Sequence, residues 1–196
     1  QNGAGKTTTI NLFLGLIKPT GGKALIDGVE VNTTGAARDK IAYIPEVVQL
    51  YGNMSGVENL KFFSQLAGFK YTINELTALL QKVGLKDSDH HKRLSSYSKG
   101  MRQKVGIAIA LSKDAKVIFM DEPTSGLDPK ATDEFTKICK ELAAEGKSLF
   151  MATHDIFNAI NVGNRIGIMK EGKLVYSTET ANISANELQE LYLKTI

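Results

Sequence analysis

The chain has 196 residues, of which 42% are hydrophobic and 23% charged. This composition is typical of a folded globular protein and excludes a disordered or fibrous one. A chain of this length buries roughly 70% of its unfolded surface, which allows a full hydrophobic core. The 24 basic and 21 acidic residues give a net charge of +3, too small to favour nucleic acid as a partner.

A single cysteine, Cys139, excludes an internal disulfide. It continues a helical stripe with Phe135, Ile138 and Leu142, so we expect a buried core thiol. No apolar run is long enough to cross a bilayer. Any membrane-spanning part is therefore expected on another chain or another segment.

The first element is a phosphate-binding loop. Gly5, Lys6 and Thr7 complete the pattern G-x-x-x-x-G-K-[ST], and residues 1–4 fill its variable places. The opening glycine of the pattern would precede Gln1, so we expect the sequence to be a fragment that begins inside its own motif. Such a loop predicts a protein that binds a nucleoside triphosphate.

Each residue type in this loop has a chemical reason. Small residues let backbone N–H groups close around phosphate oxygens, and the helix predicted over residues 7–18 directs its positive end at the same anion. Lys6 would neutralise the β- and γ-phosphates, and the Thr7 hydroxyl would bind Mg²⁺. The predicted nucleotide-binding residues are Asn2, Gly3, Ala4, Gly5, Lys6, Thr7 and Thr8.

Helical and strand-like segments then alternate, which predicts an α/β fold with a mainly parallel sheet flanked by helices. Residues 55–93 carry helical patterns without a strand, and we interpret them as an inserted helical subdomain within a core of residues 1–54 and 94–196. The predicted helices cover residues 55–67, 72–83, 98–111, 130–144 and 186–193. The predicted strands cover residues 23–27, 29–32, 41–44, 116–120, 148–152, 165–170 and 173–176.

An acidic pair follows the apolar strand over residues 116–120. Asp121 and Glu122 would lie at the carboxyl end of a buried strand, where open α/β sheets bind ligands. Asp121 is expected to hold Mg²⁺, and Glu122 is expected to act as general base toward the attacking water. Strand alternation predicts that the two carboxylates point in different directions.

Other polar residues are less specific when taken singly. Ser98 and Gly100 open a helix, and this end is either a simple cap or a second anion site. A lone histidine after a strand, such as His154, is more often structural. His90 and His91 stand in a charged loop, and we expect both to be solvated.

The order of the motifs resembles the nucleotide-binding domain of ATP-binding cassette (ABC) transporters along essentially the whole chain. After the phosphate loop come Tyr-Ser-Lys-Gly-Met at 97–101, Asp-Glu-Pro-Thr-Ser-Gly-Leu-Asp at 121–128 and Thr-His-Asp at 153–155. Each piece alone is only suggestive, but the combination is specific. The Ser-Lys-Gly-Met form is similar to the export branch that handles drugs, antibiotics, sodium or lipids.

The resemblance implies roles that spacing does not show. Two such domains pair head to tail around two ATP molecules, so Ser98, Lys99, Gly100 and Met101 would contact the γ-phosphate held by the partner. Residues 125–128 would link the two sites, and His154 would contact the γ-phosphate.

The chain departs from the family pattern at two places. A metal-contacting glutamine is usual after the strand of residues 41–44, but Glu46 stands here, with Gln49 nearby in the wrong register. Glu46 is either a metal ligand or an exposed loop acid. The upstream aromatic residue that stacks on adenine, and the first strands, are not in this sequence, so this fragment is expected to bind ATP poorly.

The function that the resemblance implies is ATP hydrolysis that powers a transmembrane permease of an exporter, with ATP and Mg²⁺ as cofactors. The domain would be cytoplasmic, held to the membrane face by the permease. Residues 55–93 would dock on the permease, with Tyr51, Met54 and Phe62 either in that interface or in the core. Alternatives are an ATPase of the same superfamily that acts on ribosomes or DNA, and a non-hydrolysing regulator. A regulatory GTPase is unsupported because no Asn-Lys-x-Asp sequence occurs.

Overall fold

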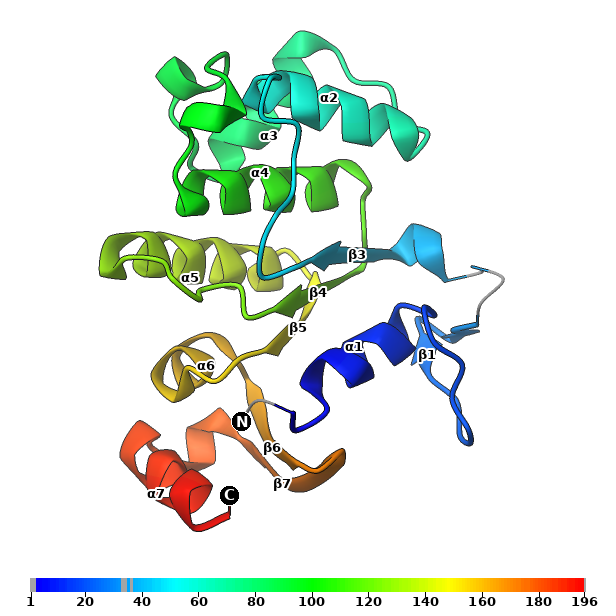
Figure 1. Cartoon of the computed structure of the whole chain (residues 1–196), viewed down its shortest axis with the longest axis vertical. Coiled ribbons are helices and arrows are strands. Elements are labelled where there is room, and N and C mark those ends of the chain that lie inside the picture. The colour runs from blue at the N-terminus through cyan, green and yellow to red at the C-terminus, as the bar shows by residue number, and fades with distance from the viewer. Residues whose placement is uncertain (1–2, 33–34, 36, 196) are drawn as a thin grey trace.

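The centre of the molecule is a parallel sheet. The structure is a computed structural model and describes residues 3–32, 35 and 37–195. Strands β3 (Ile41–Ile44), β4 (Val117–Asp121) and β5 (Ser148–Ala152) form a parallel sheet, as predicted, and pair in that order. Helices lie on both sides of this sheet in Figure 1, so the observed fold is the predicted α/β class.

The two faces of β4 belong to two different hydrophobic clusters. Ile118 and Met120 are fully buried in the cluster shared with α4 (Lys99–Ser112) and α5 (Pro129–Ala144). Phe119 points to the opposite face, where it stacks on Phe13 with ring centroids 5.5 Å apart. This alternation is the ordinary consequence of strand geometry, and it explains why the strand has no polar face.

A helical layer covers one end of the molecule. Helices α2 (Gly56–Leu66) and α3 (Ile73–Lys82) pack on each other and on α4 (Figure 1). Both begin with a capping box, Ser55 with Glu58 and Thr72 with Glu75, in which each partner satisfies a backbone N–H of the other. The core is continuous from this layer to the sheet, since buried residues of α2 and α3 share one cluster with β4.

Two antiparallel hairpins turn at the predicted dipeptides. Strands β1 (Leu25–Ile26) and β2 (Val29–Glu30) meet at Asp27-Gly28, and both turn residues have positive φ. Strands β6 (Arg165–Lys170) and β7 (Lys173–Glu179) turn at Glu171-Gly172 in the same way. Positive φ at both positions defines the turn whose twist matches that of its strands.

Some boundaries differ from the prediction. Helix α1 covers Lys6–Phe13 rather than residues 7–18, because Gly15 adopts a φ of 68° and its N–H bonds to the Leu12 carbonyl. Leu16 bonds in turn to the Asn11 carbonyl, and together these contacts end the helix in a Schellman motif. The helical spacing of apolar residues continues beyond Gly15 to Ile17, which is why the predicted helix was too long.

The remaining elements follow β5. Helix α6 (Ile156–Val162) was missed, since its seven residues are too short for a clear periodicity. Helix α7 (Ala185–Thr195) extends one residue before and two residues beyond the predicted range of 186–193. Short 3₁₀ helices occur at Arg38–Lys40, Asp87–Asp89, Leu94–Ser96 and Thr180–Asn182.

His90 corrects one prediction. Its side chain is buried rather than solvated, and its Nε2 lies 3.0 Å from the Leu85 carbonyl oxygen. A carbonyl oxygen can only accept, so Nε2 carries the proton in this contact. His91 is exposed, as expected.

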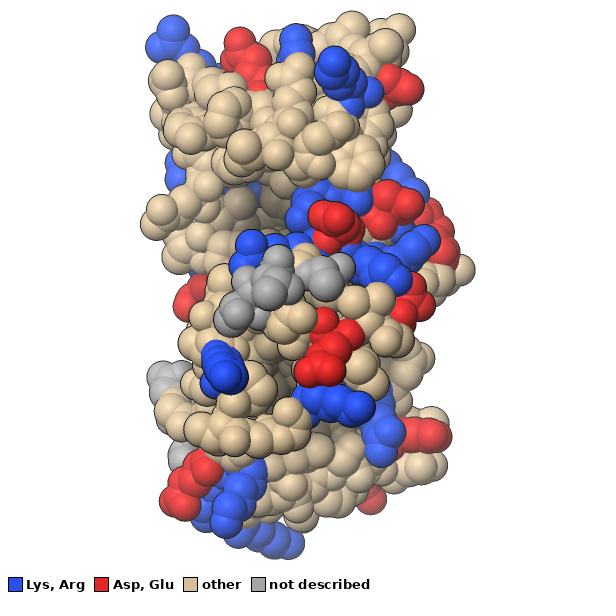
Figure 2. All heavy atoms as spheres, turned by 90° about the vertical axis from the view of Figure 1, so that its right-hand side faces the viewer, with Lys and Arg blue, Asp and Glu red and all other residues tan. Residues whose placement is uncertain are grey.

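The surface carries charges of both signs. Figure 2 shows acidic and basic side chains interspersed on one side of the molecule. Ion pairs of the structure include Lys40–Asp27 at 2.6 Å and Lys147–Asp114 at 2.7 Å. Within the described residues, no helix combines the length and the apolar character that a bilayer crossing requires.

Two leucines of α2 test the continuity of the core. Leu60 is fully buried and Leu66 is 73% exposed, so Leu60→Ala removes packing whereas Leu66→Ala removes almost none. We expect Leu60→Ala to lower the free energy of unfolding by about 2–5 kcal/mol and Leu66→Ala by less than about 0.5 kcal/mol, measured by urea denaturation. Equal effects would show that α2 is not packed as described.

Cys139 lies in the core, as predicted, and burial raises the pKa of its thiol to about 12. The thiolate is the reactive form, so we expect no reaction with a disulfide reagent at pH 8 in the folded protein. The same reagent should label one thiol once urea unfolds the chain. Rapid stoichiometric labelling without denaturant would contradict this placement.

Candidate functional site

The loop before α1 is built as a close-fitting backbone turn. Gly5 caps α1 with a φ of 98°, and a Cβ there would lie 3.0 Å from the Gly172 Cα atom. Gly3 also has positive φ, at 78°. The Ala4 carbonyl accepts a hydrogen bond of 2.9 Å from the Gly172 N–H, so the β6–β7 turn fixes the loop. The result is a backbone turn at a helix N-terminus, a shape suited to an anion.

Most of the predicted nucleotide-binding residues can be placed on this turn. Gly3 to Gly5 form the loop, and Lys6, Thr7 and Thr8 occupy the first turn of α1. Asn2 lies outside the described residues. The contact with Gly172 was not foreseen, because nothing in the spacing of a single sequence connects positions so far apart.

Thr7 and Asp121 form a pair of oxygen donors. The Thr7 hydroxyl donates to Asp121 Oδ2 at 2.7 Å, and Asp121 is buried at the carboxyl end of β4. Burial, and in smaller part the charge of Asp121, raises the pKa of Tyr43 on the adjacent strand. Mg²⁺ in nucleotide sites is usually held by one or two protein oxygens together with phosphates and water. A hydroxyl beside a carboxylate fits that donor set.

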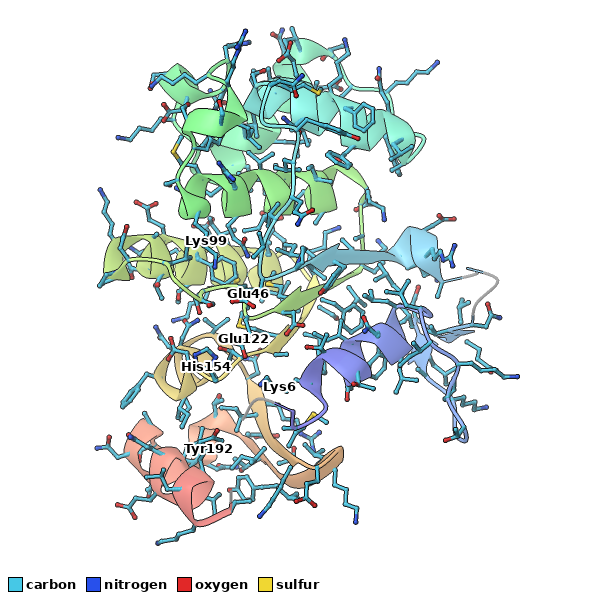
Figure 3. The ribbon with its side chains drawn as sticks, in the orientation of Figure 1. Lys6, Glu46, Lys99, Glu122, His154 and Tyr192 are labelled. Atoms are coloured by element: carbon cyan, nitrogen blue, oxygen red, sulfur yellow. The ribbon has the colours of Figure 1, made fainter. Side chains whose placement is uncertain are left out.

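Glu122 faces a different set of partners from Asp121, as predicted. Its Oε1 lies 3.4 Å from Lys6 Nζ, and its Oε2 lies 2.8 Å from His154 Nδ1. The His154 backbone N–H also donates to Oε2, at 3.2 Å. Because a carboxylate can only accept, Nδ1 of His154 carries the proton of the shorter contact. Figure 3 shows Lys6, Glu122 and His154 pointing toward a common region.

The backbone at Glu122 is unusual. Its φ is 45°, the left-handed region, and its N–H donates to the Ala152 carbonyl at 2.8 Å. Strained backbone of this kind in a residue other than glycine is often found at functional sites. The bond to Ala152 ties the end of β4 to the end of β5, just before His154. The pairing of two adjacent parallel strands is the signal that could have predicted the Glu122–His154 contact.

A buried polar network supports the two turns. Thr136 of α5 donates to Asn158 Oδ1 at 2.9 Å, and Asn158 Nδ2 donates to Thr124 Oγ1 at 3.3 Å. All three side chains are buried. Asn158 also takes part in the N-terminal cap of α6, because its backbone N–H donates to Oδ1 of Asp155, the capping residue. This network connects the turn after Glu122 to the turn that carries His154, and sequence reasoning missed it.

The Ser98 turn lies apart from this cluster. Ser98 caps α4, with its hydroxyl accepting from the Met101 N–H at 3.3 Å. A Cβ at Gly100 would lie 3.2 Å from the Ala131 Cβ, so this turn packs on the start of α5. Figure 3 shows Lys99 well separated from Lys6. One copy of the chain therefore does not bring the residues of 98–101 to its own phosphate loop.

Glu46 lies between these two groups. It is exposed in the loop after β3, and its Oε1 accepts a hydrogen bond of 2.8 Å from the Ser125 hydroxyl. Figure 3 shows Glu46 on the same side of the sheet end as Glu122. Glu46 is exposed, and its contact with Ser125 places it beside the turn that follows Glu122.

Aromatic side chains gather where β3 leads into the helical layer. Tyr51 and Phe62 make an edge-to-face contact with ring centroids 5.2 Å apart. Both are partly exposed, at 48% and 38% respectively, and Met54 is half-buried. None of these three described residues belongs to the two hydrophobic clusters, so they lie at the surface.

A cavity of about 910 Å³ opens beside the cluster of Lys6, Glu122 and His154. Its walls are β5 on one side and β6 with α7 on the other, and Tyr192 of α7 is among its lining residues. Lys6 and His154 lie at its edge. The charged cluster therefore borders a space with mainly apolar walls.

Comparison with known proteins identifies the family of the chain. The family model described as ABC transporter matches residues 1–125. The uncharacterized ABC transporter ATP-binding protein all4389 of Nostoc is 38% identical over 179 residues, which cover 90% of this chain and 53% of that protein. The lantibiotic transport ATP-binding protein SrtF of Streptococcus pyogenes is 33% identical over 193 residues, which cover 97% of this chain and 80% of that protein.

Solved structures show the same fold. The structure of cbiO1 from Clostridium perfringens, part of the ABC transporter complex cbiONQ, has a TM-score of 0.82 and 26% identity, and the match covers 98% of this chain and 78% of that one. The ATP-binding cassette MJ0796, a dimer bound to ADP and Pi, has a TM-score of 0.78 and 28% identity over 92% of this chain and 82% of that one. The chain spans about half the length of the first curated relatives, 53% in two cases.

The polar network can be tested with two asparagines of α6. Asn158→Ala leaves buried groups of Thr124 and Thr136 without partners, whereas Asn161 is exposed and bonds to Lys140 at the surface. We expect Asn158→Ala to lower the free energy of unfolding by about 1–3 kcal/mol and Asn161→Ala by less than about 0.5 kcal/mol, measured by urea denaturation. A larger loss for Asn161→Ala would contradict the assignment.

Proposed function

The chain belongs to the ABC transporter family, and from this premise we propose that it is the ATP-binding and ATP-hydrolysing part of a transporter. The observation that carries the proposal is the convergence at the end of the sheet of the phosphate loop, the Thr7–Asp121 pair and the Lys6–Glu122–His154 cluster. These groups come from distant parts of the chain, since Thr7 and Asp121 are 114 residues apart in the sequence. Such convergence is typical of phosphoryl-transfer sites, which work by positioning and charge.

The loop would bind the triphosphate. Backbone N–H groups of residues 2–8 would close around the phosphate oxygens, and Lys6 would turn its ammonium from Glu122 to the β- and γ-phosphates. Thr7 and Asp121, with Glu46, would hold Mg²⁺. When bound, Mg²⁺ supplies positive charge that offsets the negative charge of the transferred group.

Glu122 would act as the general base. A water oxygen attacks the γ-phosphorus, the bond to the β–γ bridging oxygen breaks, and Glu122 accepts a proton from the water. Once Lys6 has moved to the phosphates, Glu122 would keep its contact with His154, which would orient the carboxylate through Nδ1. His154 would also approach the γ-phosphate with its other ring nitrogen.

A second copy would complete the site. In one copy the Ser98 turn lies away from Lys6, and a helix N-terminus of this kind suits a phosphate. Ser98, Lys99, Gly100 and Met101 would therefore contact the γ-phosphate bound by a partner domain. The dimeric state described for the cassette MJ0796 supports this arrangement.

The partner in the membrane would be a permease. The helical layer, within residues 55–93, would dock on it, and the partly exposed Tyr51, Met54 and Phe62 are the proposed contacts. The protein would then lie on the cytoplasmic face of the membrane. Residues 1–54 and 94–196 would form its ATP-binding core. The name of SrtF, a lantibiotic transport protein, supports the export direction.

Glu122→Gln tests the assigned base. Glutamine is nearly isosteric but does not accept the proton at neutral pH, so hydrolysis should fall by about 100-fold or more while ATP binding persists. We also expect the full-length variant to accumulate as an ATP-bound dimer. Phosphate release, nucleotide binding and size-exclusion chromatography measure the three quantities.

The matched control is Glu141→Gln on the exposed face of α5. It makes the same chemical change far from the phosphate loop and should leave hydrolysis within about twofold of the original rate. Undiminished turnover in Glu122→Gln would refute the role of this carboxylate.

A further inference from the structure

The contact between Ser125 and Glu46 joins two loops that are 79 residues apart in the chain. The Ser125 hydroxyl donates to Glu46 Oε1 at 2.8 Å. Among the described residues, no second hydrogen bond to the Glu46 carboxylate is found. Parallel pairing of β3 and β4 brings the two loops to one edge of the sheet, and this bond then orients the Glu46 side chain between them.

The Ser125 side of the contact is held firmly. The Ser125 N–H donates to the Glu122 carbonyl at 3.1 Å, and the Leu127 N–H donates to the Thr124 carbonyl at 3.1 Å. Pro123 and Thr124 are buried, and Thr124 also accepts from Asn158. Ser125 therefore projects from a turn whose backbone is fixed on both sides and which begins at Glu122.

The Glu46 side is fixed only in its backbone. Pro45 precedes it, and Val48 is buried against α4, where a Cβ on Gly106 would lie 3.2 Å from Val48 Cγ1. The Glu46 side chain itself is exposed. An exposed glutamate samples many rotamers and loses that freedom on binding a metal. A hydrogen bond that already selects one orientation reduces this loss.

We propose that Ser125 is a positioning residue that orients the Glu46 carboxylate for the bound cation, through the hydrogen bond from its hydroxyl to Oε1. The inference rests on the proposed function, because it requires a metal–nucleotide complex at the Thr7–Asp121 pair. The turn after Glu122 and the loop that leads into the helical layer then move together. Ser125 touches neither the nucleotide nor the metal in this role and acts through Glu46.

The test measures metal binding rather than turnover. Mn²⁺ serves as a paramagnetic probe in the full-length protein saturated with a non-hydrolysable ATP analogue, and free Mn²⁺ is measured by electron paramagnetic resonance. We expect Ser125→Ala to weaken Mn²⁺ binding about fivefold, the order expected from losing one hydrogen bond to a charged group at a partly exposed site. Ser125→Thr keeps the hydroxyl and should restore the affinity to within about twofold.

The decisive comparison is made without the Glu46 carboxylate. In a Glu46→Ala background, Ser125→Ala should no longer change the Mn²⁺ affinity, since its effect passes through Glu46. Ser177→Ala, an exposed serine on β7, removes a hydroxyl elsewhere and should change nothing. A urea-denaturation cycle with the same variants should show coupling between Ser125 and Glu46 even without nucleotide.

Three results would overturn the inference. Ser125→Ala could leave Mn²⁺ affinity unchanged, could strengthen it, or could weaken it equally in the Glu46→Ala background. Failure of the proposed function has a different signature, since the unmodified protein would then bind no Mn²⁺ in a nucleotide-dependent way. The two failures are therefore distinguishable in one set of titrations.

Discussion

Parallel pairing of β3, β4 and β5 is the constraint on which the site depends, because it places the carboxyl ends of the three strands at one edge. The register pairs Ile44 with Met120 and Asp121 with Ala152. The residues that follow each strand therefore emerge beside one another, although they are far apart in sequence. The hydrogen bond from Glu122 N–H to the Ala152 carbonyl extends this pairing one residue past the strands.

The carboxylates at this edge all have hydrogen-bond or ion-pair partners among the described residues. Glu122 accepts from His154 and pairs with Lys6, while Asp121 accepts from Thr7. In the proposed function, a triphosphate entering the loop would compete with Glu122 for Lys6, so nucleotide binding and the release of the carboxylate would be coupled. The left-handed backbone of Glu122, at a φ of 45°, keeps its side chain on the side of Lys6 and His154.

The helical layer and the sheet share one hydrophobic core. Leu60 and Leu80 of the helical layer share a hydrophobic cluster with Ile118 of β4. Close packing of this kind transmits displacement, since it leaves little free volume. A partner that moves α2 would thus act on the loop that carries Glu46, and Ser125 would pass that motion to the turn after Glu122.

The sequence alone determined the elements and the chemistry of the phosphate loop, because glycine spacing, helix caps and apolar periodicity are local properties. It predicted the α/β class, the sheet strands and the separate directions of Asp121 and Glu122. Only the tertiary structure decided the contacts of Gly172 with Ala4, of Asn158 with Thr124 and of Ser125 with Glu46. It also buried His90, whose charged neighbours in sequence suggested the opposite. These contacts join segments that are distant in the sequence. The packing of helices and turns determines which residues meet, and local sequence patterns do not predict that packing.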